Sequence, residues 1–241
     1  GYTGPAFEDR FAINKVIRDY IIWETPSTVT MPIRRYNQLI DHPTFSRIYA
    51  RDILLRDDLD LLYSYNLWSF ELAPDRHAPK KETDMWADMG RLWACVNRAD
   101  LLEKFLWMVR EPPVKKTAES HNISMDSWAM GNEPISGKRY ADFVNDNASH
   151  WQTAWRNACG DNAVIRTTDR WDGTVKHLGY YSVGVQWAVR DTLSKAITTD
   201  EELVSASQER LREVEVIPDE RLTPRQLAHV KLARRIATYF R

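Results

Sequence analysis

The sequence lacks the features that mark several large classes of protein. It has nine glycines in 241 residues, and neither G-x-G-x-x-G nor G-x-x-x-x-G-K-[ST] occurs in it. Those patterns let backbone amides approach a phosphate group, so a nucleotide-dependent enzyme of a common type is not expected. No apolar run approaches about 18 residues, the length needed to cross a bilayer. We therefore expect no membrane span, although a peripheral membrane contact stays open.

The sequence has only two cysteines and almost no net charge. Cys95 and Cys159 lie far apart in the sequence, in a pattern typical of neither a zinc site nor a disulfide framework. We interpret them as free thiols of an intracellular protein in a reducing compartment. Lysine plus arginine (33) nearly balances aspartate plus glutamate (34), so the formal charge is -1. The chain lacks the overall basic field of a nonspecific nucleic-acid binder, and no nucleic-acid partner is expected.

The first residue is Gly1, with no methionine before it. The N-terminal residues form neither a hydrophobic signal region nor an arginine-rich leader. Either a targeting segment has been removed or the sequence starts at another kind of boundary. The first alternative suits an organelle protein, and the mitochondrion is the compartment that we predict.

Apolar residues recur mainly at steps of three and four, which predicts an all-α fold of about seven to nine helices. The clearest segment, 84–110, follows a capping Thr83 and ends before Pro112. A second runs from a capping Ser136 to Gly160, which is placed to take a left-handed conformation. Further helices are predicted over residues 7–23, 34–40, 45–53, 59–70, 185–197, 199–214 and 224–240.

One short segment has a different character. Val164, Ile165 and Thr167 precede Asp172-Gly173, and this composition predicts a β-hairpin near residues 163–181. We expect a single helical domain over 1–241. A subdivision would fall at the proline-containing connection 111–137.

Ten tryptophans are the most unusual feature of the sequence. Tryptophan buries a large area and keeps one N–H donor, so it favours cores and interfaces. We assign Trp86, Trp93, Trp151 and Trp155 to the core. Those beside proline, glycine or turn segments are predicted to bind a partner, as is the basic face of the last helix. These predicted partner-binding residues are Trp23, Trp128, Trp171, Arg225, Lys231, Arg234 and Arg235.

Two acidic clusters bear on catalysis: Asp57, Asp58 and Asp60, and then Asn145, Asp146 and Ser149. They resemble the magnesium-binding motifs of helical isoprenoid enzymes such as terpene cyclases. In such enzymes, carboxylates on facing helices bridge metal ions to a diphosphate. The sequence departs from both motifs, because Leu61 and Thr153 stand where the last acids are expected. We favour an exposed acidic turn and a solvated polar face, and we predict no metal ligand, cofactor or catalytic residue.

These observations leave three classes of function. The leading prediction is a non-catalytic accessory or structural subunit of a multi-protein complex, such as a mitochondrial respiratory or ATP-synthase assembly, with other subunits as partners. The second is a viral coat or nucleocapsid protein, whose extended arm at 27–43 exchanges between copies. The third is a helical Mg-dependent isoprenoid-type enzyme.

Overall fold

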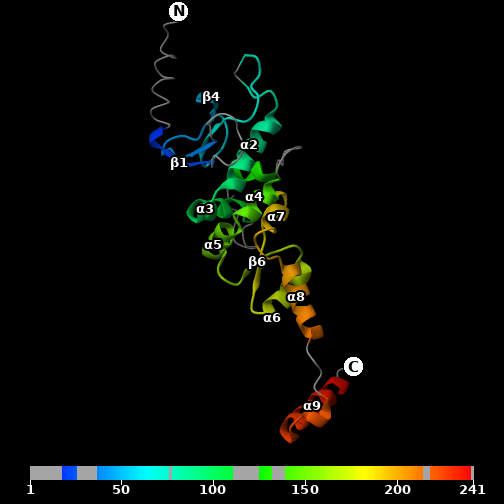
Figure 1. Ribbon diagram of the computed structural model, residues 1–241. Coiled ribbons are helices and arrows are strands. Elements are labelled where there is room, and N and C mark those ends of the chain that lie inside the picture. The colour runs from blue at the N-terminus through cyan, green and yellow to red at the C-terminus, as the bar shows by residue number, and fades with distance from the viewer. Residues whose placement is uncertain are drawn as a thin grey trace, which may run out of the picture. The chain divides into compact units, whose positions relative to one another are not determined.

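The computed structural model describes residues 18–25, 37–75, 78–110, 125–131, 139–213 and 218–239 (Figure 1). Side chains are described at these positions except at 213 and 237–239. The chain divides into two compact units, Gly1–Glu201 (unit 1) and Glu202–Arg241 (unit 2). Within the described part, no helix is both long enough and apolar enough to cross a membrane.

Unit 1 contains a five-stranded sheet, so the prediction of an all-α fold is wrong and the fold is α+β. The strand order is β1-β2-β5-β3-β4, in which β5 is antiparallel to β2 and parallel to β3. The strands are β1 (Ile21–Glu24), β2 (Gln38–Ile40), β3 (Ile48–Ala50), β4 (Ile53–Arg56) and β5 (Ser64–Leu67). Strands thus replace the helices predicted at 45–53 and 59–70, the described end of 34–40, and the end of 7–23. Residues 7–17 of that last prediction lie outside the described residues.

The β3–β4 hairpin shows why the sequence misled. Its turn consists of Arg51 and Asp52, with φ values of 53° and 65°. A two-residue turn of this kind normally contains glycine or asparagine, and neither stands here to signal it. Side chains hold the turn instead: Asn66 accepts from the Asp52 backbone N–H at 3.0 Å and donates to its carboxylate at 2.7 Å. The Arg51 guanidinium donates to the Phe70 carbonyl at 3.2 Å.

The predicted helix at 84–110 is two helices, α2 (Glu82–Cys95) and α3 (Ala99–Val109). Val96 breaks it with an extended backbone, ψ 127°. The predicted start at Ser136 lies outside the described residues, and the rest of the helix predicted at 136–160 likewise divides at Asn147 into α4 (Tyr140–Asp146) and α5 (Ala148–Cys159). Gly160 follows with φ +95°, a conformation that favours glycine. These breaks let each helix pack in its own direction: α2 against α4 and the 3₁₀ helix η1 (Met125–Gly131), and α3 against α5.

The predicted hairpin at 163–181 is also wrong. β6 (Ala163–Ile165) and β7 (Tyr181–Val183) pair in parallel, and the connection contains η2 (Asp169–Trp171) and α6 (Asp172–His177). Parallel strands require such a crossover, whereas a hairpin joins antiparallel ones. Asp172-Gly173 therefore begins a helix instead of forming a tight turn. The helix predicted at 185–197 is α7 (Trp187–Leu193).

Unit 2 holds most of α8 (Asp200–Glu213), together with η3 (Asp219–Arg221) and α9 (Pro224–Tyr239). The predicted start of the last helix is confirmed. The Thr223 hydroxyl accepts from the Gln226 N–H at 3.4 Å, and the Gln226 side chain accepts from the Thr223 N–H at 2.9 Å. This reciprocal cap precedes a proline at the first helical position. Among the described side chains of unit 2, Val204 alone is buried.

A buried carboxylate joins η1 to the sheet. Asp126 is fully buried and accepts hydrogen bonds from the Leu62 N–H at 2.6 Å, the Tyr63 N–H at 3.4 Å and the Tyr65 hydroxyl. The Trp93 indole of α2 donates to the same Tyr65 oxygen at 2.9 Å. One acid therefore ties together η1, the segment leading into β5, and α2. Burial and the neighbouring Asp126 charge raise the pKa of Tyr65 well above its ordinary value.

Close helix packing generates the first prediction. A Cβ atom at Gly90 of α2 would meet the Ala129 carbonyl oxygen and would lie 2.7 Å from the Tyr140 hydroxyl. We expect Gly90→Ala to lower the free energy of unfolding by about 2 kcal/mol or more, because the added methyl overpacks the core. Gly173→Ala is the control, since nothing lies within 4 Å of its added Cβ, and it should leave stability unchanged or raise it by up to about 1 kcal/mol. Urea unfolding of both variants measures the difference, and equal midpoints would contradict the packing.

The Asp126 network generates the second prediction. Asp126→Asn replaces one acceptor oxygen by an amide donor that faces other donors. We expect a loss of about 2 to 3 kcal/mol in the free energy of unfolding. Asp100→Asn removes a carboxylate that is 59% exposed and paired with Arg98, and should cost less than about 1 kcal/mol. If Asp126→Asn lowers the free energy of unfolding no more than Asp100→Asn does, the Asp126 network contributes little to stability.

Candidate partner-binding surface

The predicted partner-binding tryptophans lie on three different elements. Trp23 of β1 is buried in the core, 7% exposed, and its indole donates to the Asn97 side chain at 3.1 Å. Trp171 of η2 is half-buried, with the Arg170 guanidinium 4.7 Å from its ring centroid. Trp128 of η1 is 61% exposed. Trp128 is thus the one of the three with most of its surface open to a partner.

Two exposed tryptophans were missed by the sequence interpretation. Trp187 is 80% exposed at the start of α7, and Trp107 is 51% exposed on α3. Both lie in segments that read as regular amphipathic helix, where nothing in a single sequence separates an outward tryptophan from an inward one. The core assignment is confirmed for Trp93, Trp151 and Trp155, which are buried, whereas Trp86 is half-buried.

The start of α7 is held against both η1 and the end of α3. The Gln186 backbone N–H donates to the Val109 carbonyl at 2.9 Å, and the Gln186 side chain donates to the Ser127 hydroxyl at 3.3 Å. A Cβ at Gly131 would lie 2.8 Å from the Cβ of Ala188, so η1 and α7 approach closely. Three elements therefore meet at residues 185–188.

The three elements that meet here, α3, η1 and α7, each carry one of the exposed tryptophans. Trp187 belongs to the segment 185–188 itself. Trp128 belongs to η1 and lies between Ser127 and Gly131, the two residues through which η1 approaches α7. Trp107 packs under the Arg110 guanidinium, 3.8 Å from the ring centroid, and Arg110 in turn pairs with Val185 in a β-bridge. We refer to Trp107, Trp128 and Trp187 as the tryptophan surface.

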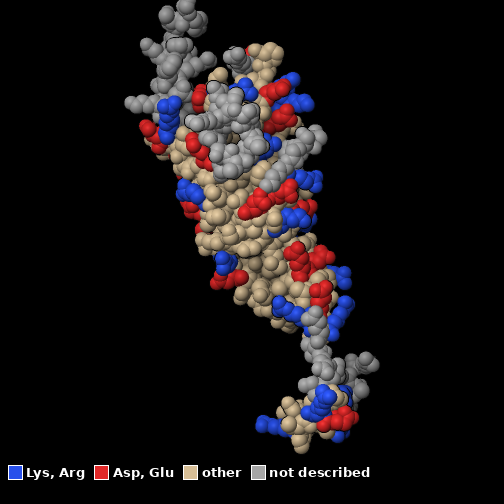
Figure 2. All heavy atoms as spheres, in the orientation of Figure 1, with Lys and Arg blue, Asp and Glu red and all other residues tan. Residues whose placement is uncertain are grey.

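The tryptophan surface has the Arg110 cation beside Trp107. Arg110 is fixed there because its guanidinium also donates to the Ala158 carbonyl at 3.2 Å. Charged side chains are sparse around α3 and α5 on the face of unit 1 that Figure 2 shows. Large indoles that remain outside the core are typical of binding surfaces.

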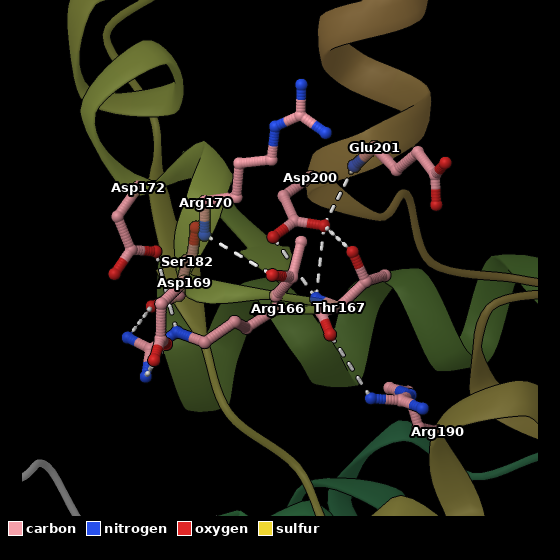
Figure 3. Close-up of polar contacts among 10 residues, drawn as sticks. Arg166, Thr167, Asp169, Arg170, Asp172, Ser182, Arg190, Asp200 and Glu201 are labelled. Atoms are coloured by element: carbon pink, nitrogen blue, oxygen red, sulfur yellow. Dashed lines mark hydrogen bonds and ion pairs between the residues drawn. The ribbon is translucent and has the colours of Figure 1, made fainter.

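A polar cluster lies at the carboxyl ends of the parallel strands β6 and β7, an edge where many α/β proteins bind ligands (Figure 3). Fully buried Asp200 accepts from the Thr167 N–H at 3.0 and 3.1 Å, from the Thr167 hydroxyl at 2.5 Å and from the Glu201 N–H at 2.8 Å. The carboxylate is thus occupied in joining β6 to the start of α8. This arrangement stabilises the fold.

Arg166 forms the second half of this cluster. It lies 3.5 Å from the Asp172 carboxylate and 3.8 Å from that of Asp169, and donates to the Ser182 carbonyl at 3.4 Å. Figure 3 shows these contacts converging on the single guanidinium. These contacts join the end of β6 to η2, α6 and β7. Arg166 therefore stabilises the crossover connection between the two strands.

The acidic clusters occupy different kinds of element. Asp57, Asp58 and Asp60 follow β4 in a loop rather than on a helix, while Asn145 and Asp146 belong to α4. The Arg56 guanidinium, 2.7 Å from Asp58, lowers the pKa of that carboxyl. Among the described residues, no three His, Cys, Asp or Glu side chains gather as they would around a metal ion.

An open hollow of about 550 Å³ lies beside the β3–β4 turn. Its lining consists of Arg51, Ile53, Glu71, Leu72, Ala73 and Pro74. Glu71 is paired with Lys80 at 2.6 Å, and Arg51 donates to a backbone carbonyl. The two charged residues of the lining are thus engaged with neighbouring groups of the protein.

Comparison with known proteins gives no relative: no protein-family model, no curated protein and no solved structure matches this chain significantly.

The polar cluster generates the third prediction. Asp200→Ala leaves the Thr167 N–H and hydroxyl and the Glu201 N–H without their acceptor. We expect a loss of about 2 kcal/mol in the free energy of unfolding. Asp191→Ala is the control. It removes a carboxylate that is 92% exposed and should change the free energy of unfolding by less than about 0.5 kcal/mol. Chemical denaturation measures the stability of the two variants. An Asp200 variant as stable as the Asp191 variant would contradict the role of Asp200 in stabilising the fold.

Proposed function

We propose that this protein is a non-catalytic structural subunit of a multi-protein complex and that it binds another subunit through the tryptophan surface. One observation carries the proposal: α3, η1 and α7, which meet at residues 185–188, each carry a tryptophan that is more than half exposed. Burying an indole in the core stabilises a folded protein, so indoles that stay exposed are typical of binding surfaces.

The energetics favour a protein partner. Burying one largely exposed indole contributes about 3 kcal/mol at roughly 25 cal/mol per Å² of apolar area. Tryptophan and arginine are also the residue types that most often dominate the affinity of an interface. Arg110 already lies over Trp107, so its side chain is ordered before the partner arrives, which lowers the entropy lost on binding.

The assembly that we propose is an organellar one, such as a mitochondrial respiratory or ATP-synthase complex. This part of the proposal rests on the sequence: two cysteines without a pairing pattern, a near-neutral charge and no phosphate-binding glycine pattern. Fractionation of the native source tests it. The chain should co-migrate with mitochondrial markers and enter a native gel as part of a large complex.

The fourth prediction concerns the surface itself. The variant Trp107→Ala/Trp128→Ala/Trp187→Ala should keep the unfolding midpoint of the parent chain, because exposed side chains contribute little to stability. In the native source it should leave the large complex, since removal of interface tryptophans costs about 2 kcal/mol or more each. Native gel electrophoresis with an antibody to the chain measures the redistribution.

Leu62→Ala is the matched control, because Leu62 is apolar and 53% exposed and lies outside the tryptophan surface. It should stay in the complex. A triple variant that folds and remains fully assembled would show that the tryptophan surface does not bind the partner subunit. A wild-type chain found as a free monomer would overturn the whole proposal, and self-assembly of the purified chain into particles would favour the coat-protein alternative.

A further inference from the structure

Charge is strongly segregated along this chain. Residues 221–241 contain six cations and no acid: Arg221, Arg225, Lys231, Arg234, Arg235 and Arg241. The whole chain has 33 cations and 34 acids, so the remaining residues hold 27 cations and 34 acids. A near-neutral total thus conceals a basic C-terminal segment, and segments of this kind often bind acidic partners.

The helix α9 has two distinct sides. Arg234 forms a two-pronged ion pair with Asp219 at 2.9 and 3.1 Å, which turns that side of the helix toward η3. Leu227 and Val230 lie on the same side, at helical spacing from Arg234, and are half-buried. This side of α9 is therefore used within unit 2.

The opposite side presents apolar side chains to solvent. Leu232 and Ile236 lie two residues before and after Arg234, which places both about 160° around the helix from it. They are 57% and 50% exposed. Ala228, one turn earlier, is exposed as well and continues the same stripe. Arg225 and Arg235 border this stripe, which we call the α9 stripe: Ala228, Leu232 and Ile236.

We propose that the α9 stripe docks into an apolar groove bordered by acidic side chains on a protein subunit of the complex. This inference rests on the proposed function and names the chemistry of one partner. Anchors at i and i+4 are typical of a helix bound in a protein groove. The segment 221–241 carries six cations and no acid, so acidic side chains on a partner would complement its charge.

A bilayer surface fits this helix less well. Interfacial helices carry a wide apolar face, commonly with Trp or Phe anchors. Among the described side chains of α9, the exposed stripe is narrow and aliphatic, and Leu227 and Val230 lie on the other side. Nucleic acid fits the helix still less well, because a charged phosphate backbone has no apolar surface against which Leu232 and Ile236 could pack.

The fifth prediction tests this docking in the intact assembly. A photoreactive residue, His229→p-benzoylphenylalanine, is placed at an exposed position beside the stripe. Irradiation of the native complex should crosslink it to a protein subunit, at a peptide whose apolar residues are flanked by Asp or Glu. The double reversal Arg225→Glu/Arg235→Glu should lower the crosslink yield about tenfold or more, because like charges then face each other across the groove.

Arg210→Glu/Arg212→Glu on α8 is the matched control, with the same change in charge at exposed positions. It should leave the crosslink unchanged. Circular dichroism of each purified variant checks that helix content is retained.

Three results would overturn the docking: crosslinks only within this chain, crosslinks to lipid, or equal loss in both charge-reversal variants. Flotation of the purified chain with vesicles of phosphatidylserine and phosphatidylcholine supplies an independent check. Binding to them would assign α9 to anionic headgroups. A chain that is assembled but not crosslinked through α9 contradicts this inference alone, whereas a chain outside any complex contradicts the proposed function.

Discussion

The buried Asp126 carboxylate is the interaction on which the arrangement of unit 1 depends. Two donors from the segment leading into β5 and one from β5 itself converge on it, and the Trp93 indole reaches the same group through the Tyr65 hydroxyl. A buried carboxylate is costly unless it is fully hydrogen-bonded, so the acid specifies this one placement of η1 against the sheet. A short 3₁₀ helix has few hydrogen bonds of its own with which to hold that position.

The position of η1 in turn sets the tryptophan surface. Ser127 directly follows Asp126 and accepts from Gln186, and Gly131 gives α7 its close approach through Ala188. Trp128 lies between these two contacts. The surface is therefore built on a rigid junction of three elements, although none of its tryptophans belongs to the core. A preorganised surface loses less entropy on binding, which fits a subunit that occupies one fixed place in an assembly.

A second buried acid, in the middle of α2, supports the same architecture. Asp88 accepts from the Ser69 N–H at 2.9 Å and lies 3.2 Å from the Arg91 guanidinium. Burial raises its pKa even though the Arg91 charge acts in the opposite direction. With Asp126, it fixes α2 to the segments on both sides of β5, so polar contacts set the register of the mainly apolar packing between sheet and helices.

The sequence predicted long regular elements better than short ones. Apolar spacing located α2, α3 and α5, and the Thr223-Pro224 cap located α9, because these signals are local. The strands are three or four residues long, and their hairpin turns at Arg51-Asp52 without glycine, so their apolar residues read as helix. Trp187 and Trp107 were missed because their exposure is decided by tertiary packing. Trp128 was identified because it lies near glycine and proline.

The most direct test of the account is oxidative footprinting of individual tryptophans, compared between the free chain and the native complex. Trp107, Trp128 and Trp187 should react readily in the free chain and become protected in the complex, while the buried Trp93 and Trp151 stay protected in both. If the three exposed indoles remain equally reactive after assembly, the tryptophan surface is not the interface and the central claim is contradicted.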